Sequence, residues 1–130
     1  MTPPRKLEYR FEAIAICAIV SIYCANRFLY SFDGLLPTAF TRNHFNDLCG
    51  GMLFPAYANA LFEALKVPIR IDDYPKAIVL GLACSVAWEV IAPLVLERST
   101  ADPIDACMYL GGGVLYVLAR RLVLGSDARR

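Results

Sequence analysis

A single histidine and several acidic residues could do chemistry in this chain, because they fall in or beside long apolar segments. His44 and Asp47 stand three positions apart, so they share one face if the segment is helical. Asp105 and Tyr109 define a comparable face farther along, and Glu89 lies inside an apolar stretch. Imidazole and carboxylate groups bind divalent cations and transfer protons, so these residues are the first candidates for a functional site.

Glu89 is the candidate whose charge is most costly to place, because it lies inside a predicted membrane-spanning helix. It precedes Glu97 by eight residues, which places it about 12 Å from the end of its predicted helix. A charge at the centre of a membrane-spanning helix costs roughly 2.5–3.5 kcal/mol on insertion scales. The carboxyl group must therefore be protonated, paired, metal-bound or open to water. A neutral carboxyl hydrogen-bonded to a neighbouring helix is the structural alternative, but a functional role is favoured.

Four apolar stretches must position these side chains. They cover about residues 11–30, 47–65, 77–96 and 104–124. Each is roughly 20 residues long, enough for a helix to cross the hydrocarbon layer of a membrane. Hydrophobic residues make up 58% of the chain, whereas soluble domains contain roughly 45–50%. The sequence therefore predicts an all-α fold, a four-helix transmembrane bundle that forms a single integral membrane domain over residues 1–130.

Basic residues are distributed unevenly around these helices. Ten of the 13 Lys and Arg residues lie in the N-terminal tail, the middle loop or the C-terminal end. Under the positive-inside rule, this distribution predicts a multi-pass protein of the inner or plasma membrane with both termini cytoplasmic. Loops 31–46 and 97–103 then face the other side. No basic stripe is present, so nucleic acid is not an expected partner.

The predicted topology gathers the polar candidates towards the non-cytoplasmic face. The predicted binding set is His44, Asp47, Glu89, Arg98, Asp102, Asp105 and Tyr109. Asp102 precedes a proline and is a good N-cap, so capping is favoured for it. Asp47 and Asp105 lie in first helical turns, where the helix dipole stabilises acids, but their convergence favours function. His44 fits an interfacial cap as well as a ligand or proton carrier.

Small residues indicate where the helices pack. They are Gly50 and Gly51 in the second stretch, Gly81 and Ser85 in the third, and Gly111, Gly112 and Gly113 in the fourth. Small side chains let helix backbones approach closely in lipid, so we expect these faces in the bundle interior. The loop 31–46 is unusually apolar, and we expect it to lie in the membrane interface or to fold back against the bundle.

The polar positions resemble the pattern of the VanZ-like family of small membrane proteins. The matching positions are His44-Phe45, Glu89, Arg98, Ser99 or Thr100, Asp105 and Gly112, within roughly residues 42–117. The chain departs from the family pattern at Phe40, Ala92 and Tyr109, where Asp, Gln and Asn are expected. The resemblance implies a four- or five-helix module of the bacterial cell envelope, associated in the founding member with teicoplanin resistance.

Three functions from different classes fit these residues. The first, which the resemblance favours, is a binding or resistance-associated module that engages an envelope lipid, a glycopeptide-like ligand or a partner protein. The second is a metal-dependent hydrolase or transferase acting on a lipid-linked phosphate. In it, His44, Asp47, Glu89 and Asp105 hold Mg²⁺ or Mn²⁺, or His44, Glu89 and Asp105 act as catalytic acids and bases. The third is a proton- or ion-coupled transporter in which Glu89 changes protonation, as a homo-oligomer because four helices enclose little space.

Overall fold

A computed structural model describes residues 5–29, 34–35, 37–96 and 102–127, and within these ranges the side chains of Arg5, Glu89, Ser126 and Asp127 are not described. The elements, in chain order, are α1 (Arg5–Leu29), α2 (Thr38–Asn43), α3 (Phe45–Ala64), α4 (Tyr74–Val86), η1 (Ala87–Ile91), α5 (Ala92–Val95) and α6 (Pro103–Asp127). The described residues contain no strand, so the predicted all-α class is confirmed.

The helix ends differ from those predicted, because apolar composition marks the apolar part of a helix rather than its limits. α1 begins at Arg5, six residues before the predicted start at 11. α4 begins at Tyr74 because Asp73 caps it: the Oδ1 atom of Asp73 accepts a hydrogen bond from the Lys76 backbone N–H at 2.9 Å. Asp102 likewise accepts from the Ile104 N–H at 2.9 Å, at the start of α6.

The third predicted helix contains a local change of helix type. α4, η1 and α5 follow one another without a break, but η1 is π-helical, and the Ala92 N–H bonds to the Ala87 carbonyl five residues back. Pro93 explains the position of this segment. A proline inside an α-helix has no N–H to donate and its ring clashes with the carbonyl of residue i−4, here Glu89. A wider π turn accommodates both effects.

The closest approach between helices is at the crossing of α3 and α6. A Cβ atom on Gly51 would lie only 2.8 Å from the Cα atom of Tyr109. A Cβ atom on Gly112 would lie 2.8 Å from the Cα atom of Gly51. Gly81 and Ser85 are buried on α4, which packs on α6. The predicted interior position is therefore confirmed for these small residues.

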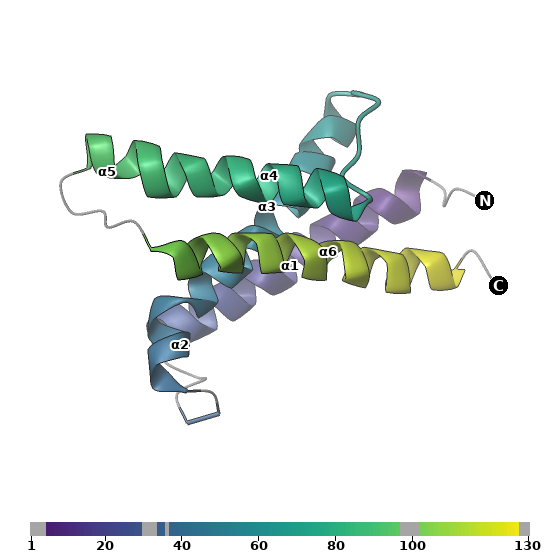
Figure 1. Cartoon of the computed structure of the whole chain (residues 1–130). Coiled ribbons are helices and arrows are strands. Elements are labelled where there is room, and N and C mark those ends of the chain that lie inside the picture. Colours follow the sequence, from purple (N-terminus) through teal and green to yellow (C-terminus); the bar gives the residue numbers. More distant parts are fainter. Residues whose placement is uncertain (1–4, 30–33, 36, 97–101, 128–130) are drawn as a thin grey trace.

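Figure 1 shows how the elements are arranged. α4, η1 and α5 form one long rod that runs alongside α6, while α3 crosses behind and contacts both α1 and α6. Both ends of the chain and the α3–α4 connection lie at one end of the bundle, which we call the terminal end. α2 and the start of α6 lie at the opposite end, which we call the α2 end. The central core cluster is Ala56, Ile71, Ala77, Tyr116 and Val117.

Two described helices are long and apolar enough to cross a membrane: Lys6–Leu29 and Pro103–Gly125. Only 17% of the most apolar stretch of the first, and 39% of the second, is buried within the bundle. The α4 segment, Tyr74–Val86, is apolar but shorter. α3 carries Asp47 and Glu63 and does not meet the same test. Length and composition thus identify two of the four predicted spans.

Candidate functional site

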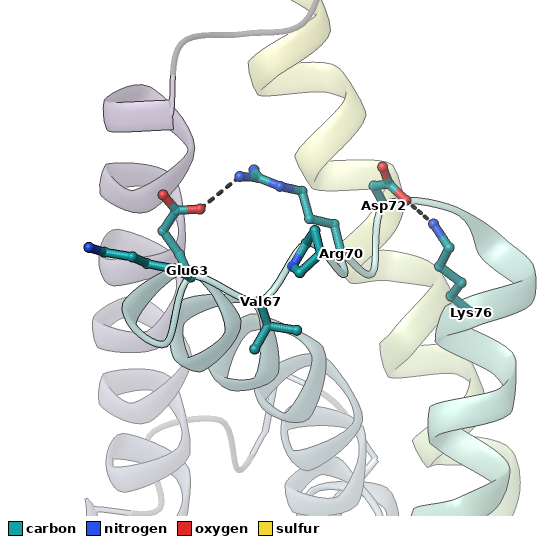
Figure 2. A pocket seen from close by; sticks show the side chains of 7 residues that line it. Glu63, Val67, Arg70, Asp72 and Lys76 are labelled. Atoms are coloured by element: carbon teal, nitrogen blue, oxygen red, sulfur yellow. Dashed lines mark hydrogen bonds and ion pairs between the residues drawn. The ribbon is translucent and has the colours of Figure 1, made fainter.

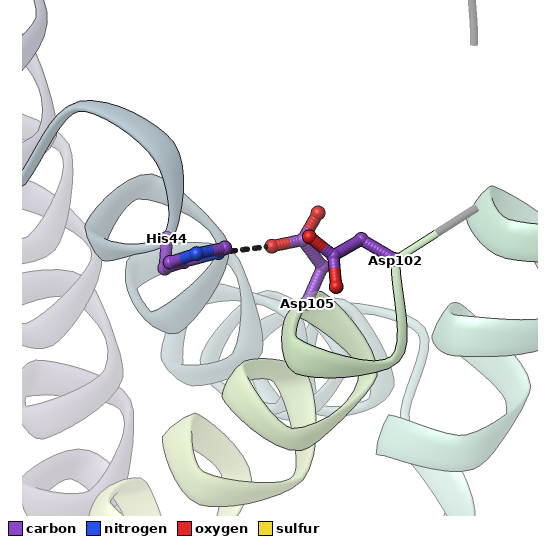
Figure 3. Close-up of side chains that lie close together, drawn as sticks. All are labelled: His44, Asp102 and Asp105. Atoms are coloured by element: carbon purple, nitrogen blue, oxygen red, sulfur yellow. Dashed lines mark hydrogen bonds and ion pairs between the residues drawn. The ribbon is translucent and has the colours of Figure 1, made fainter. Parts of the chain in front are cut away.

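At the α2 end, three polar residues form what we call the His–Asp cluster: His44, Asp102 and Asp105. His44 is the single residue between α2 and α3, with φ −120° and ψ −23°, so it belongs to a bend rather than to either helix. Asp105 lies in the first turn of α6. The Nδ1 atom of His44 is 2.7 Å from the Oδ1 atom of Asp105. Figure 3 shows the two side chains pointing towards one another. The two side chains are 18% and 21% exposed, so the pair is accessible from outside the bundle.

The geometry of the His–Asp cluster is compatible with a divalent cation. One potential ligand atom from each of the three side chains lies within 4.8 Å of the others. Asp102 also caps α6 through its Oδ1 atom, which accepts from the Ile104 N–H. One imidazole and two carboxylates suit Mg²⁺ or Mn²⁺, and the partial exposure leaves room for a ligand on the cation. The sequence analysis placed Asp102 in the binding set but favoured capping as its role, and the structure shows capping together with this proximity to His44 and Asp105.

Asp47 and Tyr109 form a separate contact deeper in the bundle. The Tyr109 hydroxyl donates to the Oδ1 atom of Asp47 at 2.9 Å, which links α3 to α6 beside their glycine crossing. The structure therefore places these two predicted residues together, but the three-residue cation cluster does not include Asp47.

The side chains of the remaining predicted residues lie outside the described part of the structure. The backbone of Glu89 belongs to the π-helical segment η1, and its side chain is not described. Arg98, Ser99 and Thr100 fall in residues 97–101, which are not described either. The proposed roles of Glu89 and Arg98 stay predictions.

A buried amide fixes the bend that carries His44. The Nδ2 group of Asn26 in α1 donates to the Thr41 carbonyl at 2.8 Å and to the Oδ1 atom of Asn46 at 3.1 Å. Thr41 is fully buried, and its hydroxyl donates to the Thr38 carbonyl at 3.0 Å. One side chain thus ties α1 to α2 and α3. The part of loop 31–46 that forms α2 does fold back against the bundle, as expected.

A second polar cluster, at the terminal end, was not found by sequence reasoning. We call it the terminal network, and it consists of Glu8, Glu12, Asn59, Arg70, Tyr116 and Arg120. At its centre, the Tyr116 hydroxyl donates to the Oε2 atom of Glu12 at 2.6 Å and accepts from the Nδ2 group of Asn59 at 2.7 Å. The Nε atom of Arg120 donates to Glu12 at 3.2 Å. These contacts join α1, α3 and α6.

The outer part of the terminal network consists of ion pairs. Arg70 contacts Glu8, and its Nη2 atom lies 2.7 Å from the Oε2 atom of Glu63. Arg120 also reaches Glu8, at 3.5 Å. A sequence signal existed: Glu8 and Glu12 are one helical turn apart, and so are Tyr116 and Arg120. Because Glu8, Glu12, Arg70 and Arg120 each contact an opposite charge, the network is well suited to joining helices.

Beside this network, a surface hollow of about 320 Å³ lies along the α3–α4 connection. Figure 2 shows Glu63 reaching towards Arg70 and Asp72 towards Lys76, so the hollow has charges of both signs that neutralise one another. The pKa of Asp73 is lowered, chiefly because its carboxylate accepts a hydrogen bond from the Lys76 backbone N–H and also lies near the Lys76 side chain. Lys66 also lines the hollow and forms no ion pair with a described residue, so the lining keeps one excess positive charge.

Comparison of the chain with protein-family models, with curated proteins and with solved structures gives no match.

Proposed function

We propose that this chain is a VanZ-like integral membrane protein of four spans that binds a ligand of the cell envelope through the His–Asp cluster on the non-cytoplasmic face. The observation that carries the proposal is the 2.7 Å contact between His44 and Asp105. These residues are 61 positions apart and come from different helices, and both stay partly exposed. A contact of this kind keeps an imidazole and a carboxylate in a fixed relative position at the surface of the bundle.

The surface of the bundle supports membrane insertion. Large apolar side chains are exposed along the whole length of the rod, with Val79 at 66%, Leu94 at 82% and Val95 at 74%. Soluble monomers seldom expose continuous apolar surfaces of this extent. Among the described residues, no buried polar side-chain atom lacks a hydrogen-bond partner, which is the condition that a lipid environment imposes. α3 has 20 residues, and the rod from 74 to 95 is comparable, so both are long enough to cross the hydrocarbon layer.

The charge of the His–Asp cluster indicates which ligands it favours. Two carboxylates next to one imidazole attract a cationic group, such as a protonated amine on a glycopeptide-like molecule. They also attract a divalent cation, which could bridge to the phosphate of an envelope lipid. Both ligands belong to the non-cytoplasmic side, where the distribution of basic residues orients the α2 end.

The experiment compares teicoplanin susceptibility in a bacterial host that expresses the wild-type chain, Asp105→Asn or Asp72→Asn. Asp72 is an exposed acid at the terminal end, so Asp72→Asn is a control with the same change of charge. We expect the wild-type chain and the control to raise the inhibitory concentration, and Asp105→Asn to abolish the increase at equal membrane abundance. If Asp105→Asn protects as well as the wild type, the His–Asp cluster is not the functional site.

A second candidate function is favoured by the position of Asp102. Because Asp102 joins His44 and Asp105 within 4.8 Å, the cluster can act as a three-ligand cation site of a hydrolase or transferase for lipid-linked phosphates. The protein purified in detergent should then bind Mn²⁺ in a calorimetric titration, and His44→Ala should remove the binding while Asp72→Asn retains it. Failure of the wild-type protein to bind Mn²⁺ or to release phosphate from such lipids would exclude this candidate.

A further inference from the structure

An apolar groove follows α1 on the side that faces α6. It encloses about 520 Å³, within the range of small-molecule binding sites. The residues that line it include Phe11, Ile14, Ala18, Ile22, Met52 and Val123. On α1 the lining extends from Leu7 to Ile22, which corresponds to about 22 Å along the helix. Half of a bilayer's hydrocarbon layer measures about 15 Å, so the groove can hold the acyl chain of a lipid from one leaflet.

A cationic hollow joins this groove at the terminal end. It encloses about 400 Å³ and is lined by Lys6, Tyr9, Arg10 and Glu63. Arg10 lines both the groove and the hollow. Lys6 and Arg10 are one helical turn apart, so their positive charges lie on the same side of α1.

The positive charge of this hollow is not compensated. Neither Lys6 nor Arg10 forms an ion pair with any residue that the structure describes. The one acid in the lining, Glu63, already bonds to Arg70 at 2.7 Å. The hollow in Figure 2 differs in this respect, because its Arg70 and Lys76 contact acidic side chains. Lys6 and Arg10 therefore place two positive charges beside the apolar groove, where they attract an anion, whereas the cation without an ion pair in the other hollow, Lys66, does not line the groove.

We propose that the groove and the cationic hollow together bind one anionic phospholipid of the cytoplasmic leaflet. One acyl chain lies in the groove between α1 and α6, and the phosphate lies between Lys6 and Arg10. The inference depends on the membrane orientation given in the proposed function, which places the terminal end at the cytoplasmic leaflet, where anionic lipids attract basic residues. It concerns the opposite end of the bundle from the His–Asp cluster, so the two sites can be tested separately.

The test measures lipid binding to the full-length protein in detergent by native mass spectrometry, with phosphatidylglycerol and phosphatidylcholine of identical acyl chains as probes. We expect the wild-type protein to prefer phosphatidylglycerol on the order of tenfold, as two basic side chains near an anionic headgroup would produce. Lys6→Gln/Arg10→Gln should remove this preference. Ala18→Phe, which places a large ring in the groove at an exposed position of α1, should weaken the binding of both lipids.

The control is Lys66→Gln/Lys76→Gln, which removes the same charge from the terminal end outside the groove. An equal loss of preference in the control would show diffuse attraction to the basic end and would overturn the proposal. So would inorganic phosphate competing as well as the lipid, or a second copy of the chain occupying the groove in cross-linking of the Ala18 position. A normal lipid preference combined with failed teicoplanin protection would reject the proposed function alone.

Discussion

Tyr116 shows how single residues hold this bundle together. Its hydroxyl accepts from Asn59 and donates to Glu12, so one side chain links three helices. The same Asn59 uses its amide to bond the backbone of Ile71 in both directions, at 3.0 Å and 2.7 Å. The position of the α3–α4 connection thus depends on the same polar contacts that join α1 to α6.

Replacement of Tyr116 by Phe should destabilise the protein, because it leaves the buried Glu12 carboxylate and the Asn59 amide each without one partner. We expect a loss of about 1–2 kcal/mol in the free energy of unfolding, measured by denaturant titration of the protein in mixed micelles. Tyr57→Phe is the matched control, since Tyr57 is exposed and its hydroxyl makes no hydrogen bond with a residue that the structure describes. Equal stability of the two variants would contradict the structural role of Tyr116.

At the residue scale, the sequence predicted one of the two polar clusters. Spacing and topology brought His44 and Asp105 to the same end, and the structure places them in contact. The terminal network was not predicted, because its members come from four separate segments and their contacts depend on which helices are neighbours. Asp102 is a similar case. Its sequence context predicts an N-cap, but it does not predict that His44 and Asp105 are close to its side chain.

The crossing of α3 and α6 is the element-scale feature on which the fold most depends. Gly112 has backbone atoms of Leu48 and Gly51 where a side chain would begin. Backbone atoms cannot move aside as flexible side chains can, so any larger residue must separate the helices.

Gly112→Val should therefore prevent the close approach of these helices. We expect a destabilisation of about 3 kcal/mol or more, at the upper end of the range for overpacking. Gly125→Val is the control on the same helix, because a Cβ atom at Gly125 would meet nothing within 4 Å. Thermal unfolding of both variants in the same detergent would measure the difference, and a comparable unfolding temperature would show that the crossing is more tolerant than its geometry indicates.

At the element scale, the sequence predicted the existence of the helices and the helix faces, formed by small residues, that pack together. It did not predict the π-helical turn, because a hydrophobic pattern does not report which carbonyl each N–H reaches. Pro93 was the available signal for that turn. α2 was also not predicted as a helix, since its six residues are too few to show a period.

For the whole molecule, composition predicted the helical class, and the described residues form helices and no strand. Composition does not determine which helices are neighbours. α1 packs mainly on α3 and touches α6 only slightly, and this arrangement opens the apolar groove. Such a groove depends on the relative tilt of three helices, which no single segment encodes.

The proposed orientation predicts a labelling pattern in intact cells. In a background without the five native cysteines, Leu35→Cys should react with a membrane-impermeant maleimide, because Leu35 is exposed beside the α2 end. Lys66→Cys, at the terminal end, should react only after lysis. Mass shifts on gels would measure both reactions, and the reverse pattern would place the His–Asp cluster in the cytoplasm.

The π-helical turn has a consequence for length variation in this chain. Each residue of an α-helix rotates the next by about 100°, so removing one residue between Ala87 and Ile91 would restore a regular helix without shortening the rod by more than about 1.5 Å. The helical segments before and after the turn would keep their present orientation towards α6 only if the deleted residue were the extra one in the π-helical turn. A deletion elsewhere in residues 74–86 would turn every preceding side chain away from α6. Single-residue gaps should therefore be tolerated at this turn and rejected on its N-terminal side.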